Sequence, residues 1–271
     1  MDGPHVCVCL KSVPDPRRPY QSEVDPRTGV VRRSADELGI PRVAGPFDRC
    51  ALEEALRVKE AHGGEVTVLT MDTHAASEVL REALALGADR SVLICDPALA
   101  GADTLATART LAAAIRTLGP CDLILCGAWS YHGNTGQVGP QLAELLQIPH
   151  ISFASKLDFI SARTIRARSE GDNEFSILEA DLPVLVTVVE AINVPRRASL
   201  LGILQARDRP ILRMGLDQLD LLAGQVGLAG SPTRVVGATA VASKRRAEVI
   251  GGVSSEATSR LLEILRELAV L

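Results

Sequence analysis

The sequence predicts an α/β fold with a doubly wound, mostly parallel sheet, antiparallel strands at one edge and a C-terminal extension. Short apolar segments alternate with amphipathic segments of helical spacing through the first half of the chain, which is typical of β–α–β units whose sheet is buried on both faces. In the second half, strand-like segments follow one another across short polar turns, which indicates antiparallel pairing. Aromatic residues make up only 3% of the 271 residues, so alanine, leucine, valine and isoleucine must fill the core.

Each element of the first half has its own pattern. Residues 5–10 form an apolar run that predicts a buried strand. Residues 48–62 carry an apolar stripe at helical spacing from Ala51 to Val58, and Gly63 ends this helix. The same alternation continues, with strands predicted at 65–70, 91–95 and 122–126, and helices at 75–86, 103–118 (capped by Asp103) and 137–146.

The pattern changes after Pro149. Proline and glycine interrupt short helices beyond Asn193, residues 227–241 look extended, and residues 254–268 form a final amphipathic helix. Because this last part makes a poor core by itself, we expect one domain over 1–192 and an arm over 193–271 that wraps around it or around a partner. Between Pro149 and Asn193, strands are predicted at 151–160, 164–169, 175–180 and 183–190, with a hairpin tip at 171–173.

Charge and composition exclude several classes of function. A net charge of −4 predicts no binding to nucleic acid or to anionic lipid. No apolar run reaches the ~18 residues of a membrane span, and the chain does not begin like a secretory signal, so we expect a cytoplasmic protein without membrane insertion. P-loop, G-x-S-x-G and H-E-x-x-H motifs are absent, and Glu53 and Glu54 lie on a helix that amphipathicity already explains. Nothing indicates a self-sufficient catalyst.

The six cysteines fit this compartment, and none belongs to a C-x-x-C pair. Cys7, Cys9, Cys95 and Cys126 lie in apolar runs, where cysteine behaves as a small buried hydrophobic residue. Cys7 and Cys9 share one face of the first strand, but two ligands do not make a metal site. We therefore expect buried thiols and no metal.

Three loops are candidates for a ligand site, because open parallel sheets bind ligands beyond the carboxyl ends of their strands. They follow Lys11, cover residues 45–48 and span residues 127–140. The third is rich in glycine and opens a helix, so its backbone amides and the helix dipole favour a phosphate, with Asn134 and Thr135 as side-chain donors. An ordinary βα loop without a ligand is the alternative, and the dinucleotide motif G-x-G-x-x-G is absent.

Gly133 offers a test of the phosphate interpretation. We expect Gly133→Val to abolish nucleotide binding, because a side chain would fill the space of the phosphate and penalise a positive φ.

Several stretches, in order along the chain, resemble the beta subunit of electron transfer flavoproteins, the EtfB/FixA family. Residues 46–56 read PFDRCALEEAL, close to the family's P-F-D-x-x-A-L-E-E-A-L, and residues 8–15 follow its V-x-x-K-x-V-P-D. Residues 83–90, 153–156 and 193–196 are similar to A-L-A-M-G-A-D-R, F-A-S-K and N-E-P-R.

The resemblance implies an electron-carrier subunit whose Rossmann-like, adenine-nucleotide-binding domain (1–192) pairs with an alpha subunit. In this family the subunit holds AMP or, in a bifurcating branch, a second FAD. The heterodimer passes electrons between partner flavin dehydrogenases and a downstream acceptor oxidoreductase. Docking of those partners would involve Asn193, Pro195, Arg196 and Leu200 within the segment 193–207. The nucleotide would contact Cys9, Lys11, Gly45, Pro46, Phe47, Asp48, Met71, Gly127, Ala128, Ser130, Gly133, Asn134, Thr135, Gly136, Gln137 and Val138.

The chain departs from the family within both regions. Trp129, His132 and Asn134 replace a glutamine and two aspartates of the nucleotide loop, and Val194 and Arg197 replace a glutamate and a tyrosine of the docking segment. An atypical choice of partner is therefore expected.

The sequence leaves AMP and a second FAD open, and electron bifurcation with them. Residues 137–140 and 226–234 resemble the longer members that carry a second FAD. Two other functions of similar topology are an adenine-nucleotide enzyme and a universal-stress-type nucleotide sensor. The first would need an S-G-G-x-D-S loop and the second a G-x-x-G-x(9)-G-[ST] loop, and both loops are absent.

Overall fold

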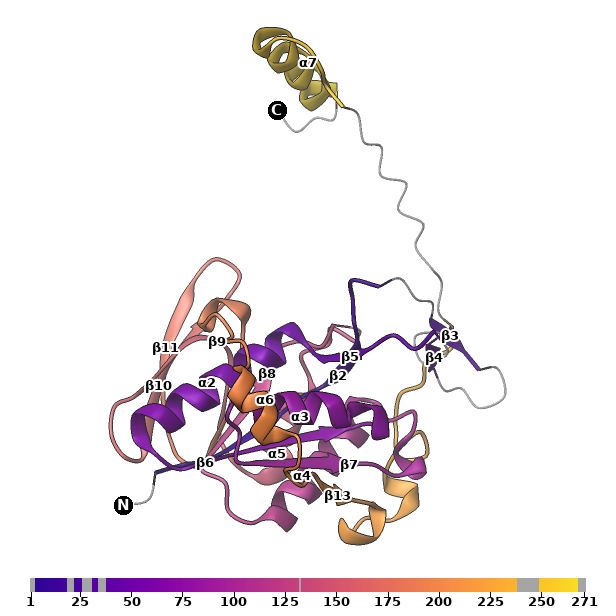
Figure 1. Cartoon of the computed structure of the whole chain (residues 1–271), viewed down its shortest axis with the longest axis vertical. Helices are drawn as coiled ribbons and strands as arrows, with labels where there is room; N and C mark the ends of the chain where they lie inside the picture. Colours follow the sequence, from indigo (N-terminus) through magenta and orange to yellow (C-terminus); the bar gives the residue numbers. More distant parts are fainter. Residues whose placement is uncertain are drawn as a thin grey trace. The chain divides into compact units, whose positions relative to one another are not determined.

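A computed structural model describes residues 3–18, 22–25, 31–33, 38–131, 133–237 and 249–267. The chain divides into two compact units, residues 1–238 and residues 239–271. The first unit contains a large sheet and the helices that cover it, and the second contains the helix α7 (Ser254–Glu267) (Figure 1). The predicted end of α7 at Leu268 lies outside the described residues.

The first unit is built on a nine-stranded sheet with the order β11-β10-β9-β12-β8-β1-β6-β7-β13. From β1 the chain runs outward to β6 and β7 and then returns to place β8 on the other side of β1 (Figure 1). The strand order therefore reverses between β1 and β8. The central parallel strands are β1 (His5–Cys9), β6 (Glu65–Met71), β7 (Arg90–Ile94), β8 (Leu123–Gly127) and β12 (Val184–Val188).

Helices cover both faces of the sheet, which confirms the predicted doubly wound fold. Successive side chains of a strand point to opposite faces. Val6 and Val8 accordingly join the core beneath α2 and α3, whereas Cys7 and Cys9 join the core beneath α4 and α5. The four helices named are α2 (Pro46–His62), α3 (Ser77–Leu86), α4 (Thr104–Leu118) and α5 (Val138–Leu146).

Local signals explain where these helices begin and end. Pro46 occupies the first turn of α2, where its missing N–H costs no hydrogen bond, and Gly63 ends the helix at a φ of 76°. The Asp103 carboxylate accepts the amide of Ala106 at 3.0 Å and caps α4 as predicted. Among the described residues, no helix combines the length and the apolar character that crossing a bilayer requires.

One edge of the sheet carries the predicted hairpin. β9 (His150–Phe159), β10 (Thr164–Glu170) and β11 (Phe175–Asp181) pair antiparallel in succession. The strand predicted at 183–190 has a different place, because β12 lies inside the sheet and pairs parallel with both β8 and β9. All residues of β12 are buried, as expected of an interior parallel strand.

The opposite edge holds β13 (Leu212–Met214), parallel to β7, in a region where only short helices were predicted. The short helix α6 (Leu200–Ala206) packs against α3. The expectation of an extended segment at 227–241 is wrong for residues 227–230, which form a turn because Gly227 adopts a φ of 55°. Residues 231–237 lack regular structure, and residues 238–241 lie outside the described residues.

Smaller elements complete the unit. Two antiparallel pairs precede α2, namely β2 (Ser12–Pro14) with β5 (Arg42–Ala44), and β3 (Ser22–Val24) with β4 (Val31–Arg33). Single 3-10 turns lie at His74–Ala76, Pro97–Leu99, Glu190–Ile192, Leu216–Gln218 and Ala223–Gln225.

Candidate functional site

The carboxyl ends of β1 and β8 are joined by one side chain. Asp48, the third residue of α2, accepts the backbone N–H of Lys11 at 3.2 Å and that of Gly127 at 3.3 Å. Gly45, just before α2, donates its N–H to the carbonyl of Lys11 at 3.1 Å. The three loops singled out from the sequence therefore meet where the strand order reverses, which is where open α/β sheets bind ligands.

The backbone is crowded at this junction. A Cβ on Gly127 would lie 2.7 Å from Asp48 Oδ1 and 2.8 Å from Phe47 Cβ, and a Cβ on Gly45 would lie 2.5 Å from Asp48 Oδ2. A side chain at Gly127 would have to move the start of α2, and one at Gly45 would have to displace the Asp48 carboxyl group. The PFD stretch and the two glycines thus form one packed unit.

Burial controls the charge of Asp48. The side chain is almost completely buried, and this raises the pKa of the carboxyl to about 7, against the opposing effect of the two backbone hydrogen bonds. A carboxyl group that titrates near neutrality adds little negative charge beside a ligand. Asp48 can therefore organise an anion site without strongly repelling the anion.

The loop after β8 is held at its base and exposed at its tip. Ala128 donates its N–H to the carbonyl of Val188, and Ser130 accepts the N–H of Gly133 through its hydroxyl at 3.2 Å. Gly133, Asn134 and Thr135 are exposed at the tip of the loop. Two further predicted contacts begin helices, Pro46 in α2 and Val138 in α5. His132 lies outside the described residues.

The positive φ angles of this loop are not where they were expected. Asn134 has a φ of 48° and Gly136 a φ of 65°, whereas Gly133 has no positive φ. The prediction that Gly133→Val would strain the backbone is therefore wrong. A Cβ at this position would nevertheless lie 3.1 Å from Ser130 Oγ. Gly136 is the glycine whose backbone conformation disfavours a side chain.

Trp129, which departs from the family pattern, is packed rather than free. Its ring lies 5.5 Å from that of Phe47 in an edge-on contact and 4.9 Å from that of Phe153. A Cβ on Gly136 would lie 3.3 Å from Trp129 Nε1, so the loop folds back over the indole. The aromatic contacts connect the loop to the start of α2.

The remaining predicted contacts lie around this junction, and they differ in burial. Cys9 ends β1 and is buried, and its neighbour across the strand pair is Cys126. Met71 ends β6, one strand farther out, and packs partly against the core beneath α4 and α5. The side-chain oxygen Oε1 of Gln137 accepts a hydrogen bond from the Thr104 hydroxyl at 3.1 Å.

The chemistry of the donors fits a phosphate group. The first amides of α5 have no partner within the helix, and the helix dipole favours negative charge at this end. The hydroxyls of Ser130 and Thr135 stand in the same loop, and Thr135 is exposed. Such donors suit a phosphate group.

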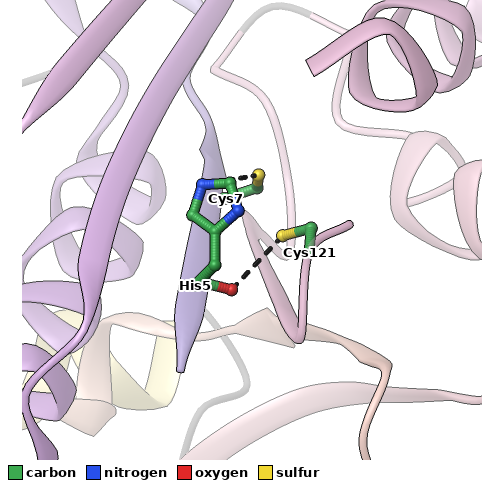
Figure 2. A group of neighbouring side chains, drawn as sticks. All are labelled: His5, Cys7 and Cys121. Carbon is green, nitrogen blue, oxygen red and sulfur yellow. Dashed lines mark hydrogen bonds between the residues drawn. The ribbon is translucent and has the colours of Figure 1, made fainter. Parts of the chain in front are cut away.

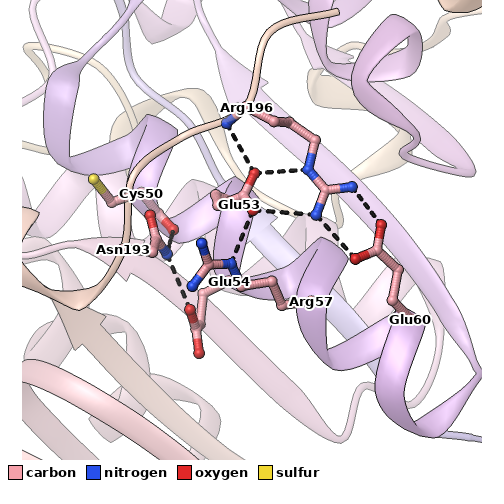
Figure 3. A network of polar contacts seen from close by, with 7 residues as sticks. All are labelled: Cys50, Glu53, Glu54, Arg57, Glu60, Asn193 and Arg196. Carbon is pink, nitrogen blue, oxygen red and sulfur yellow. Dashed lines mark hydrogen bonds and ion pairs between the residues drawn. The ribbon is translucent and has the colours of Figure 1, made fainter.

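A second site surrounds residues 193–196, which cross α2 near its middle (Figure 3). The Asn193 amide nitrogen donates to the carbonyl of Cys50 at 3.0 Å and to Glu54 Oε2 at 2.9 Å. The Arg196 guanidinium forms ion pairs with both Glu53 and Glu60, and the Arg196 backbone N–H also donates to Glu53. The segment is thus fixed to α2 by charged hydrogen bonds.

Glu53 and Glu54 were missed as functional residues, because amphipathicity seemed to explain their helix. Both are buried, with side chains turned to the docking segment. Burial raises the pKa of Glu53, but hydrogen bonds from Arg196 and Arg57 outweigh it and lower the pKa below its usual range. The sequence signal for this role was a pair of adjacent glutamates beside an apolar stripe.

The rest of the docking segment packs against α3 and exposes apolar side chains to solvent. Leu200 is 74% exposed, and Val194 and Leu204 are also exposed, whereas Pro195 is half-buried. Gly202 lets α6 approach α3 closely, since a Cβ there would lie 2.3 Å from the carbonyl of Ala85. An exposed apolar face on a fixed helix is typical of a protein contact.

Comparisons with known proteins show which family the chain resembles. A family profile described as "Electron transfer flavoprotein domain" matches residues 34–218. "Electron transfer flavoprotein subunit beta" of Thermoanaerobacterium thermosaccharolyticum is 38% identical over 268 residues, which cover 98% of this chain and 100% of that protein.

Two further relatives extend the comparison. "Caffeyl-CoA reductase-Etf complex subunit CarD" of Acetobacterium woodii is 37% identical over 97% of this chain and 98% of its own length. "Protein FixA" of Sinorhizobium fredii is 38% identical over 85% of this chain and 81% of its own length.

Proposed function

Because the chain belongs to the electron transfer flavoprotein family, alongside its beta subunits and FixA proteins, we propose that it is the beta subunit of a heterodimeric electron carrier. One observation carries the proposal: a single helix, α2, holds both candidate sites. Its first turn joins the nucleotide crevice through Asp48, and its middle fixes the docking segment through Glu53 and Glu54. A nucleotide and a protein partner would therefore be positioned by one rigid element.

The crevice would hold the adenine nucleotide part of AMP or of a second FAD. The α5 N-terminus and the hydroxyls of Ser130 and Thr135 would bind phosphate, with Gly45 to Asp48 forming the opposite wall. AMP would contribute only to structure there, whereas a second FAD would add a redox centre. In either case this chain's residues bind and orient the nucleotide.

The docking segment would bring the proteins that exchange electrons with the heterodimer close to its flavin. Partner flavin dehydrogenases would contact the exposed leucines of α6, and an alpha subunit would complete the heterodimer. Ile203 and Leu204 line a groove of about 520 Å³ between α6 and α3 that would accept an apolar side chain. The ion pairs of Arg196 hold this surface in place.

The first test identifies the nucleotide. The chain is co-expressed with its alpha subunit, the complex is denatured, and the released nucleotides are separated and counted. Two FAD per heterodimer would support a flavin in the crevice and make bifurcation with NADH testable. One FAD and one AMP would support a one-flavin carrier. Failure of the two subunits to co-purify, or release of no adenine nucleotide beyond a single FAD, would contradict the proposal.

The second test concerns docking. Leu200→Ala is expected to slow electron transfer between the complex and a partner dehydrogenase without changing flavin content. Leu222→Ala is the matched control, because Leu222 is 73% exposed but lies outside the docking segment. Equal rates for both variants would show that α6 is not the docking surface.

A further inference from the structure

The amino ends of β1 and β8, opposite the proposed nucleotide site, hold a cluster of metal-ligand side chains. His5 begins β1, Cys7 follows on the same strand, and Cys121 lies just before β8. A ligand atom from each of the three residues lies within 4.8 Å of the other two. Figure 2 shows the three side chains gathered at the start of β1.

We propose that His5, Cys7 and Cys121 bind one thiophilic d10 metal ion, Zn²⁺ or Cu⁺. Imidazole nitrogen and thiolate sulfur are the ligands that these ions favour. Tetrahedral zinc with bonds of about 2.3 Å to sulfur and 2.0 Å to nitrogen separates such ligands by about 3.5 Å. His5 Nε2 and Cys7 Sγ are 3.9 Å apart, so small side-chain rotations bring them to the separation that one shared ion requires.

The His5 ring is oriented as a metal ligand requires. Its Nδ1 lies 2.8 Å from the carbonyl oxygen of Pro120, which can only accept, so Nδ1 carries a proton and Nε2 faces Cys7. Metal-bound histidines generally donate their other ring N–H to such an oxygen. The Thr67 hydroxyl, 2.9 Å from Nε2, would turn away when a metal takes the Nε2 lone pair.

Burial and connectivity suit a bound ion. Cys7 is fully buried, whereas His5 and Cys121 are half-buried and provide a route from solvent. The Cys121 thiol donates to the carbonyls of His5 and Leu123, so binding would release its proton to solvent. The ion would join two central strands through residues 116 positions apart in the sequence.

The test uses the reduced, chelator-treated heterodimer. It is titrated with Zn²⁺, and with Cu⁺ under anaerobic conditions, against a competing chelator, and bound metal is counted. We expect Cys121→Ser to lose one equivalent or to bind at least about tenfold more weakly. Cys95→Ser is the matched control, because Cys95 is also half-buried but its Sγ lies 4.0 Å from a single histidine nitrogen, Nε2 of His74, among the described residues.

X-ray absorption of the loaded wild-type complex decides the matter if the variant does not fold. Two sulfur ligands and one imidazole around the ion would support the site, and the metal that shows them identifies its occupant. Equal binding by wild type and Cys121→Ser, a loss in Cys95→Ser instead, or a ligand shell without sulfur would overturn the proposal.

Discussion

The strand pair β1 and β8 is joined by an aspartate at each end, but the two aspartates differ in exposure. At the carboxyl end, Asp48 accepts two backbone amides while buried. At the amino end, Asp122 accepts the N–H of His5 at 2.9 Å while exposed to solvent. A buried carboxylate depends on its partners for solvation, whereas an exposed one has water as an alternative. We therefore expect the hydrogen bonds of Asp48 to contribute more to the free energy of unfolding than that of Asp122.

The surroundings of the two ends differ in chemistry as well. Glycines, hydroxyls and a helix N-terminus gather beyond the carboxyl end, and these are hydrogen-bond donors for an oxyanion. Imidazole and thiols gather at the amino end, and these are soft donors for a metal. If burial sets the contribution of each link, a change at the carboxyl end should cost more stability than a change at the amino end.

The largest effect is expected for Gly127→Val. The new side chain would meet the Asp48 backbone and the Phe47 side chain at under 3 Å, so α2 must shift, and we expect a loss of about 2–4 kcal/mol in the free energy of unfolding. Nucleotide content should fall with it. Urea denaturation of the complex measures the first and nucleotide release the second. Gly224→Val is the control, since a Cβ there meets nothing within 4 Å; equal losses in both variants would contradict the close approach.

A pH-dependent effect is expected at Asp48. Its pKa is raised from 3.8 to about 7 by burial, so between about pH 4 and pH 7 the folded protein holds a proton that the unfolded chain has released. The free energy of unfolding contributed by this group therefore falls as the pH rises through that window, by up to about 4 kcal/mol. Asp48→Asn should show a flatter dependence between pH 5 and pH 8 in urea denaturation. Parallel profiles for wild type and variant would show that Asp48 stays ionised.

Candidate ligand-binding loops at the carboxyl end of the sheet could be predicted from the sequence, whereas the side-chain cluster at the amino end could not, for a physical reason. A general rule places ligands beyond the carboxyl ends of parallel strands, and glycine patterns marked the loop there. Cys7 and Cys121 become neighbours only through the pairing of β1 with β8, which no local pattern encodes.

Long-range pairing also explains the other differences. Arg196 and Glu53 are 143 residues apart in the sequence. The contact of Glu53 with the docking segment could therefore not be predicted from the apolar stripe of its helix. β12 reads as one more strand after a hairpin, and only its register with β8 and β9 reveals its interior place. The three residues of β13 are too few for a period to appear.

A smaller effect is expected for Gly136→Ala. A φ of 65° costs a side chain about 1 kcal/mol, and the new Cβ would press on Trp129 at 3.3 Å. We expect weaker AMP binding to the complex, read from the fluorescence of Trp129, the one tryptophan of this chain. Gly119→Ala places a side chain at a φ of 102° and a ψ of −170°, which only glycine adopts readily, before the amino end of β8, and it should leave AMP binding unchanged. Equal effects would mean that the loop contributes only stability.

The smallest effect is expected for Asp122→Asn, the counterpart of Asp48→Asn. The His5 amide can exchange the lost carboxylate for the remaining carbonyl oxygen or for water, so the free energy of unfolding should fall by less than about 1 kcal/mol. Nucleotide content should stay at the wild-type value, because the link lies at the opposite end of β8 from the proposed nucleotide site. Urea denaturation of both variants at the same pH makes the comparison direct. A cost for Asp122→Asn equal to that of Asp48→Asn would mean that strand pairing, and not burial, sets the weight of each aspartate.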